Sequence, residues 1–194
     1  MWLFALPLMA GNLLQQFYNV ADTLIVGRFL GAGALAAVGS SYTVMTFLTS
    51  VILGLCMGSG VLFSMLCGAG ETERMKNSFV QSFFFIALVT GLVEGLALLL
   101  IDPMLAVFQI PADILKDTKA YLQIIFIGLV FTFVYNYFAA LLRALGNSLV
   151  PLMFLAVSAL GNIVLDLVLI LEFQMGTAGA AWATITAQFL SALG

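Results

Sequence analysis

The feature that most constrains this chain is a series of long apolar runs, separated by short breaks of glycine, proline and charged residues. A helix that crosses the hydrocarbon core of a bilayer needs about 20 mostly apolar residues. Backbone polar groups in lipid must be satisfied within their own element, so each run is expected to be helical. The runs predict an all-α integral membrane protein, a bundle of six transmembrane helices at about 2–26, 41–66, 78–101, 120–142, 149–171 and 177–194.

The composition supports this class. Hydrophobic residues make up 63% of the chain and charged residues 8%, and the mean hydropathy is +1.19. A soluble domain is only about half apolar, so the expected surroundings are a lipid bilayer. The sequence has no basic run typical of nucleic-acid binding, and no nucleophile–base pair, metal triad or phosphate loop. We therefore expect no nucleic-acid partner, no enzymatic activity and no cofactor.

The breaks between the runs predict the number of spans, but not which side of the membrane each loop faces. The charged break at 68–76 is expected to be a loop, and the apolar stretch 104–110 is expected at the membrane interface. Six spans place both termini on one side of the membrane. Arginine and lysine usually mark the cytoplasmic loops, but here each side carries three of them, so charge leaves the orientation open. Both ends break off within the apolar pattern, which suggests part of a longer protein.

Three carboxylates lie inside the apolar runs: Asp22, Glu94 and Asp166. A carboxylate at membrane depth is costly, so it needs a partner, a water-filled cavity, or a role in binding a cation or carrying a proton. Glu94 is about two turns from the end of its run, from where its side chain could reach the interface. We therefore expect the main site at Asp22 and Asp166 and leave Glu94 out of it.

Depth in the membrane groups further polar residues with the two aspartates. Since a helix rises 1.5 Å per residue, the distance from the end of each run places Asp22, Asn162, Asp166 and Thr184 in the same half of the membrane, with Tyr121 at the same end. Oxygen ligands of this kind suit a hard cation such as Na⁺. Two close carboxylates also suit a proton relay. A polar contact between helices that binds no ion is the structural alternative.

A stripe of amides on the first run predicts a cavity or a partner helix along that face, because the residues recur at about helical spacing. The expected cavity-lining residues are Asn12, Gln15, Gln16, Asn19 and, from the fourth run, Asn136. Pro7 lies within the same first run and removes one backbone hydrogen bond. It is therefore expected to bend that helix.

Several motifs resemble those of multidrug and toxic compound extrusion (MATE) transporters, in the order and spacing of that family. The stretch PLMAGNLLQQFYNVADTLIVGRFLG at 7–31 resembles the family's first helix, and ALAAVG at 34–39 continues the likeness. LRALGNSLVP at 142–151 resembles the loop between its fourth and fifth helices. NIVLD at 162–166 and GTAGAAWAT at 176–184 resemble its fifth helix and the start of its sixth. The resemblance covers essentially the whole chain.

This resemblance implies one lobe, the N-terminal one, of a two-lobed (6+6) antiporter that exchanges Na⁺ or H⁺ for organic cations and other drugs. It implies a multi-pass protein of the cell membrane with both termini in the cytoplasm. The partners would be a small organic cation and either a C-terminal lobe or a second copy of the chain. Carried over by position, the cation site comprises Asp22, Asn162, Asp166 and Thr184 with Tyr121 nearby, and Pro7 is the bending proline.

Two other functions stay open. A lipid-linked oligosaccharide flippase of the same superfamily would favour a basic cleft for the diphosphate, but the first run has no arginine or lysine at membrane depth. A non-transporting membrane assembly subunit would fit the length of the chain. It would have no need for a pair of acidic residues inside the membrane.

Overall fold

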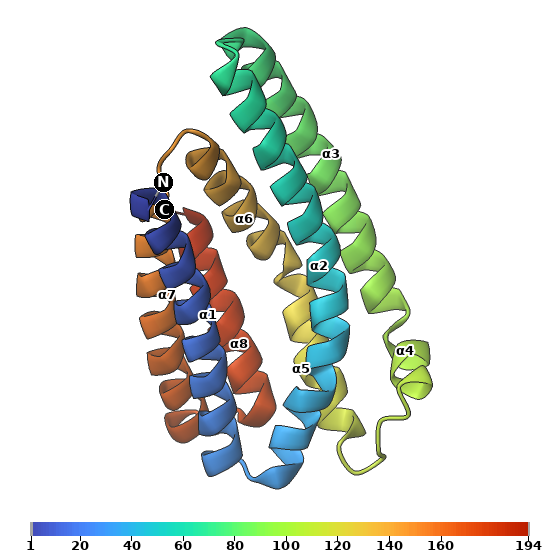
Figure 1. Cartoon of the computed structure of the whole chain (residues 1–194). Coiled ribbons are helices and arrows are strands. Elements are labelled where there is room, and N and C mark those ends of the chain that lie inside the picture. Colours follow the sequence, from blue (N-terminus) through green and yellow to red (C-terminus); the bar gives the residue numbers. More distant parts are fainter. Residues whose placement is uncertain (1, 194) are drawn as a thin grey trace.

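The computed structural model describes residues 2–193, with side chains from residue 6 onward except residue 8, and within that range it contains helices and no strand (Figure 1). The prediction of an all-α bundle is confirmed. The elements in chain order are α1 (Trp2–Phe29), α2 (Ala32–Gly68), α3 (Thr72–Leu99), α4 (Ile101–Val107), α5 (Leu115–Ile127), α6 (Leu129–Ala144), α7 (Leu149–Leu167), a π-helical turn η1 (Val168–Glu172) and α8 (Gly176–Leu193).

Length and hydropathy together identify the helices that can cross a membrane unaided. These are α2, α3 and α7 with η1, and the bent pair α5 and α6 counts as a fourth. Within the described residues, α1 and α8 fall short of the same hydropathy. The amides and Asp22 on α1, and the glycine and threonine residues on α8, lower their apolar content. α1 and α8 therefore fall short because they carry many of the polar residues predicted for the site.

The helices pack as two neighbouring groups (Figure 1). On one side α1 packs on α7, and α7 packs on α8. On the other side α2 forms a long hairpin with α3 and also packs on α5 and α6, which in turn contact α8. The outward face of α3 exposes large apolar side chains, including Phe84, Phe85 and Leu88. Such a face fits contact with lipid, where apolar exposure carries no cost.

Two buried clusters hold these groups together. The larger one surrounds the aromatic side chains of Phe63, Phe126, Phe133 and Tyr137, between α2, α3, α5 and α6. The Tyr137 hydroxyl donates to the Phe79 carbonyl oxygen at 2.6 Å, which satisfies its one polar atom in the core. The smaller cluster joins the ends of α1, α2, α5 and α8 to η1, at the end of the bundle that holds Tyr121.

The structure differs from the expected continuous span 120–142 in two respects. The helix begins earlier, at Leu115, and bends by 43° between α5 and α6 at Gly128. A Cβ atom on Gly128 would lie 2.6 Å from Cγ1 of Ile185 in α8. The missing side chain therefore lets α8 approach the bend closely, and this contact between distant segments has no local signal in the sequence.

Other boundaries differ because helices continue beyond the apolar runs. α2 starts at Ala32 rather than 41, and α3 starts at Thr72, inside the charged break expected to be a loop. The chain turns at Gly31 and Gly70, which have φ angles of 87° and 73°. Hydropathy marks the part of a helix that lies in lipid, whereas glycine in the left-handed region marks where the helix ends. The short α4 occupies 101–107, close to the interfacial stretch expected at 104–110.

A candidate cation site and the adjoining cavity

The two aspartates meet where α1 packs on α7. Asp22 is 9% exposed and Asp166 is 0% exposed, and their carboxyl groups lie close enough to act on one another's charge. The ion pairs of the described residues involve other carboxylates, so neither aspartate is matched by an arginine or lysine. The structure therefore brings together two buried carboxyl groups without a basic counter-charge.

The oxygen atoms of this cluster lack donors. Within the described part of the chain, no hydrogen bond reaches Asp22 Oδ1, either carboxylate oxygen of Asp166, or Asn162 Oδ1. Asn162 lies one helical turn before Asp166 on the same face of α7 and is 1% exposed. A buried polar atom without a partner costs about 1–3 kcal/mol. The cluster thus presents converging acceptors that a hard cation or a proton would satisfy.

Tyr121 and Thr184 complete the predicted set. Tyr121, from α5, is buried and lies within electrostatic range of both aspartates. Thr184, from α8, donates to the carbonyl oxygen of Ala180 at 3.1 Å and lines a cavity together with Asn162. All five residues predicted from the sequence therefore lie at one end of the bundle. Four helices supply them.

A cavity of about 380 Å³ extends from this cluster between the helices. Its size matches the roughly 300–1,000 Å³ of sites that hold drug-sized molecules. Most of its lining side chains come from α1, α2, α6, α7 and α8. Amides, hydroxyls and two tyrosines provide the polar part of its lining, namely Asn12, Gln15, Tyr18, Thr132, Tyr135, Asn136, Ser148, Ser158, Asn162, Thr184, Gln188 and Ser191.

The predicted amide stripe is only partly correct. Asn12, Gln15 and Asn136 line the cavity, but Gln16 and Asn19 are not part of its lining. The Asn19 amide instead donates to Oε1 of Gln16 at 3.3 Å, on the exposed side of α1. Each residue turns a helix by about 100°, so Gln16 points well away from Gln15. The inward face of α1 follows the spacing 11, 15, 18 and 22, which ends at Asp22.

Pro7 and Glu94 take separate positions. Pro7 is buried and lines the cavity, while α1 remains one continuous helix from Trp2 to Phe29. Its role in bending that helix stays a prediction. Glu94 is half-buried on α3, which packs on α2, α4, α5 and α6 rather than on the helices that carry the aspartates. Glu94 therefore lies outside the acidic cluster, as expected.

Tyr18, which the sequence places on the same side of the first run as Gln15, continues the inward face of α1 between Gln15 and Asp22. Other lining residues were not identified from the sequence. Ser158 donates to the carbonyl oxygen of Ala187 at 2.7 Å, which ties α7 to α8 within the lining. Arg143, which stands at the end of the fourth apolar run, lines the cavity as well. No local pattern distinguishes such an arginine from one at the membrane surface.

Comparison with known proteins agrees with this arrangement. The MatE family model matches residues 7–168. The chain is 38% identical to the probable multidrug resistance protein YpnP of Bacillus subtilis (strain 168), over 98% of this chain and 43% of that protein. It is also similar to a multidrug resistance MATE family transporter of the MOP superfamily in the outward-facing conformation, with 25% identity and a TM-score of 0.92. That match covers 98% of this chain and 42% of the transporter.

A second solved structure, of MATE in the bent conformation, gives 26% identity and a TM-score of 0.90, over 96% of this chain and 42% of that one. The chain thus spans about two fifths of the length of the curated relatives it matches. This share corresponds to one lobe of a two-lobed transporter, with the multi-pass membrane fold that the apolar helices require. The relatives are transport proteins rather than enzymes.

Proposed function

The chain belongs to the MatE family, and on that premise we propose that it forms the N-terminal lobe of a cation-coupled antiporter that exports organic cations. The single observation that carries the proposal is the group of buried oxygen atoms without donors at Asp22, Asn162 and Asp166. In a purely structural contact between helices, donors would match these acceptors. Here the two carboxyl groups can pair with one another only through a shared proton, which fits a site that exchanges a proton or another small cation.

The coupling ion is Na⁺ or H⁺. Sodium binds through oxygen ligands alone. The two carboxyl groups and the Asn162 amide offer such ligands, and the Thr184 hydroxyl lines the same cavity as Asn162. A proton would need only the aspartates, which could share it across the contact between α1 and α7. Both ions would neutralise the same buried negative charge, so each is compatible with the arrangement.

The substrate we propose is a partly apolar organic cation held in the adjoining cavity. Tyr18 and Tyr135 supply aromatic faces, which attract cations, and Leu53, Met57 and Leu155 supply apolar surface. The acidic pair lies just beyond Asn162 and gives that end of the cavity a negative potential. A second lobe would close the far side of the pathway, in keeping with the share of the relatives' length that this chain covers.

In the cell we expect both termini in the cytoplasm and the acidic cluster in the outer half of the membrane. A cation would then load from outside and drive the export of a substrate taken up from the cytoplasm. The chain alone would bind the cation and the substrate. Alternating access, however, would need the second lobe.

The test uses efflux by the intact transporter that carries this lobe, in cells or reconstituted vesicles. Asp22→Asn and Asp166→Asn should each abolish ion-coupled export of an ethidium-like dye while leaving expression unchanged. Each variant removes one charge and keeps the shape of the side chain. Imposed Na⁺ and H⁺ gradients, applied separately, identify the coupling ion.

Glu94→Gln is the matched control, because it also neutralises a carboxylate inside the membrane but lies on α3, away from the cluster. It should retain most of the coupled export. Wild-type coupling in both aspartate variants would mean that the acidic pair is structural. Loss of coupling in all three variants would mean that any charge change disturbs the fold.

A further inference from the structure

Arg143 differs from the other basic side chains of the chain. There are six lysine and arginine residues in total. Three of them form ion pairs near the helix ends, namely Arg74 with Glu71, Lys76 with Glu73 and Lys119 with Asp102. Arg28 and Lys116 are exposed at the surface. Arg143 is partly buried in the lining of the cavity, and its Nε–H has no acceptor among the described residues.

The surroundings of Arg143 contain no internal counter-charge. The described lining of the cavity includes neither aspartate nor glutamate, and near Arg143 it offers Tyr135 and neutral hydroxyl groups. Arg143 lies in the last turn of α6, where the helix dipole favours a positive charge. The dipole does not supply an acceptor for the guanidinium donors, however, and a buried donor without one is costly. The structure thus leaves a positive charge facing a cavity of ligand size.

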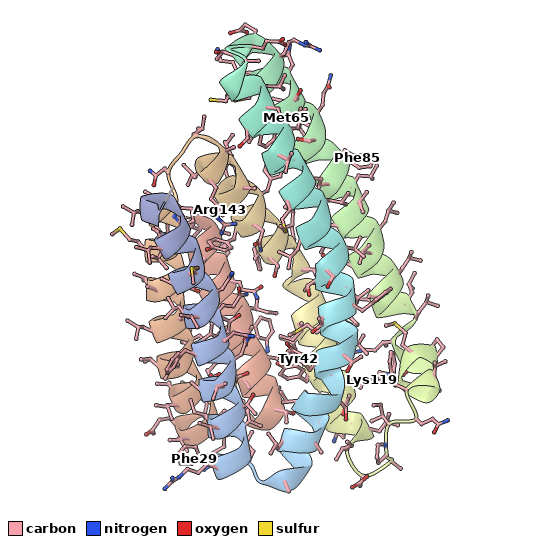
Figure 2. The ribbon with its side chains drawn as sticks, in the orientation of Figure 1. Phe29, Tyr42, Met65, Phe85, Lys119 and Arg143 are labelled. Atoms are coloured by element: carbon pink, nitrogen blue, oxygen red, sulfur yellow. The ribbon has the colours of Figure 1, made fainter. Side chains whose placement is uncertain are left out.

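The cavity runs from Arg143 towards Asn162, and the acidic pair lies behind Asn162 rather than in the lining. Figure 2 shows Arg143 near the end of α6, and Arg143 lines the same cavity as Pro7 of α1. Tyr135, which lies within electrostatic range of Arg143, donates to the carbonyl oxygen of Pro151 at the start of α7. Asn162 lines the other end, next to Asp166. From Pro151 to Asn162 a helix rises roughly 16 Å, which is the length of an extended drug-sized molecule.

We propose that Arg143 is the residue that selects substrates with a carboxylate, so that this cavity prefers zwitterions to simple cations. The inference rests on the proposed function, because it concerns the substrate of the same cavity. A guanidinium binds a carboxylate through two parallel hydrogen bonds. The cationic end of the same molecule would face Asn162 and the acidic pair. One arginine suits a single negative charge, and the amide and hydroxyl lining suits a polar solute rather than a lipid tail.

The test compares two ligands that differ only at the anionic group. These are a xanthene dye with a free carboxylate and the ethyl ester of the same dye, which is a cation only. Binding to the intact transporter in detergent is followed by fluorescence anisotropy. The wild type should bind the acid at least tenfold more tightly than the ester, the change expected for charge-assisted hydrogen bonds. Arg143→Gln should remove this preference by weakening acid binding, with ester binding unchanged.

Controls separate this inference from the proposed function. Arg28→Gln removes a basic side chain from the surface and should keep the preference. Ester binding should still require Asp22 and Asp166. Ester binding that depends on the aspartates, combined with no preference for the acid in the wild type, would overturn the role of Arg143 and leave the proposed function intact.

Two further outcomes would also overturn it. Equal weakening of both dyes in Arg143→Gln would show a structural role for the arginine. Displacement of the ester by phosphatidylglycerol dissolved in the detergent micelles, without an acid preference, would show that Arg143 binds a lipid headgroup instead. Because the wild-type preference is measured first, the inference remains testable even if the Arg143 variant fails to fold.

Discussion

Asp166→Asn should make the protein more stable when the coupling cation is absent. Asp166 has no exposed surface, neither of its oxygen atoms has a donor among the described residues, and its neighbour Asp22 repels it when both carboxyl groups are ionised. Asparagine has nearly the same shape, no charge and an N–H donor for Asp22, so at a pH where both aspartates are ionised the substitution replaces the repulsion with a hydrogen bond. We expect a gain of about 1–3 kcal/mol, the usual cost of a buried polar group without a partner. A domain of 150–250 residues changes its Tm by about 2–4 °C per kcal/mol.

The cation should reduce or reverse this difference in stability between Asp166→Asn and the wild type. A ligand that binds only the folded state adds about 2.7 kcal/mol of stability at 100 times its Kd. Wild type should therefore gain stability as the cation concentration rises, whereas Asp166→Asn should not. The two proteins should differ most without the cation, and the difference should shrink or change sign at saturation. A substitution that stabilises the protein but removes ligand binding is typical of a functional site.

The assay is thermal unfolding of the intact transporter, monitored with a dye that becomes fluorescent on reaction with thiols. Cys56 is 1% exposed and reports the opening of this lobe, while Cys67 is exposed and is first replaced by serine. Na⁺ is varied against choline at constant ionic strength, so that screening does not change. A parallel series at different pH in choline alone tests the proton in the same way.

Glu94→Gln serves as the control, since it should keep the cation-dependent rise of the wild type. An Asp166→Asn protein that is less stable than wild type without cation would refute the reasoning about repulsion. One that keeps the full cation-dependent rise would refute the assignment of Asp166 to the site. The two results are separate, because the first concerns the empty cluster and the second concerns binding.

Two other predictions concern packing and topology. Gly128→Ala should cost about 1–3 kcal/mol of stability in thermal unfolding, because its Cβ would lie 2.6 Å from Cγ1 of Ile185. The same substitution should cost much less when it is made in an Ile185→Ala background, and strict additivity of the two changes would argue against the contact. Single cysteines at Glu71 and Asp113, in a background without other cysteines, should react with membrane-impermeant reagents from opposite sides of the membrane. Labelling of both from one side would contradict the six-span topology.

The sequence could place Asp22, Asn162 and Asp166 near one another because depth in the membrane is a strong constraint. Asp22, Asn162 and Asp166 stand out against apolar surroundings, and their distance from the end of each run fixes their height. The sequence predicts less well in which direction around its helix each side chain points. Gln15 and Gln16 are neighbours of the same type, and only the packing of α1 on α7 determines that Gln15 faces inward.

Contacts between distant segments were the part that the sequence did not reveal. The bend at Gly128 depends on Ile185, which lies on another helix, and a glycine in an apolar run has many possible roles. Arg143 occupies a position typical of a residue that ends a span, and its charge alone favours the membrane surface. Its place in the cavity depends on how α6 meets α7 and α8, which is a property of the assembled bundle.

The geometry suggests how one lobe could make cation and substrate compete without a long relay. Asn162 belongs to both features, since it lines the cavity and stands one turn from Asp166 on α7. Its amide has unpaired groups of both kinds, a donor and an acceptor, among the residues described. A cation at the aspartates would draw the amide oxygen toward itself and turn the donor toward the cavity. An ammonium group in the cavity would compete for that same oxygen. The binding of the cation and of the substrate would then be coupled in two ways. Both ligands would interact with the Asn162 side chain, and each would reduce the negative potential that attracts the other.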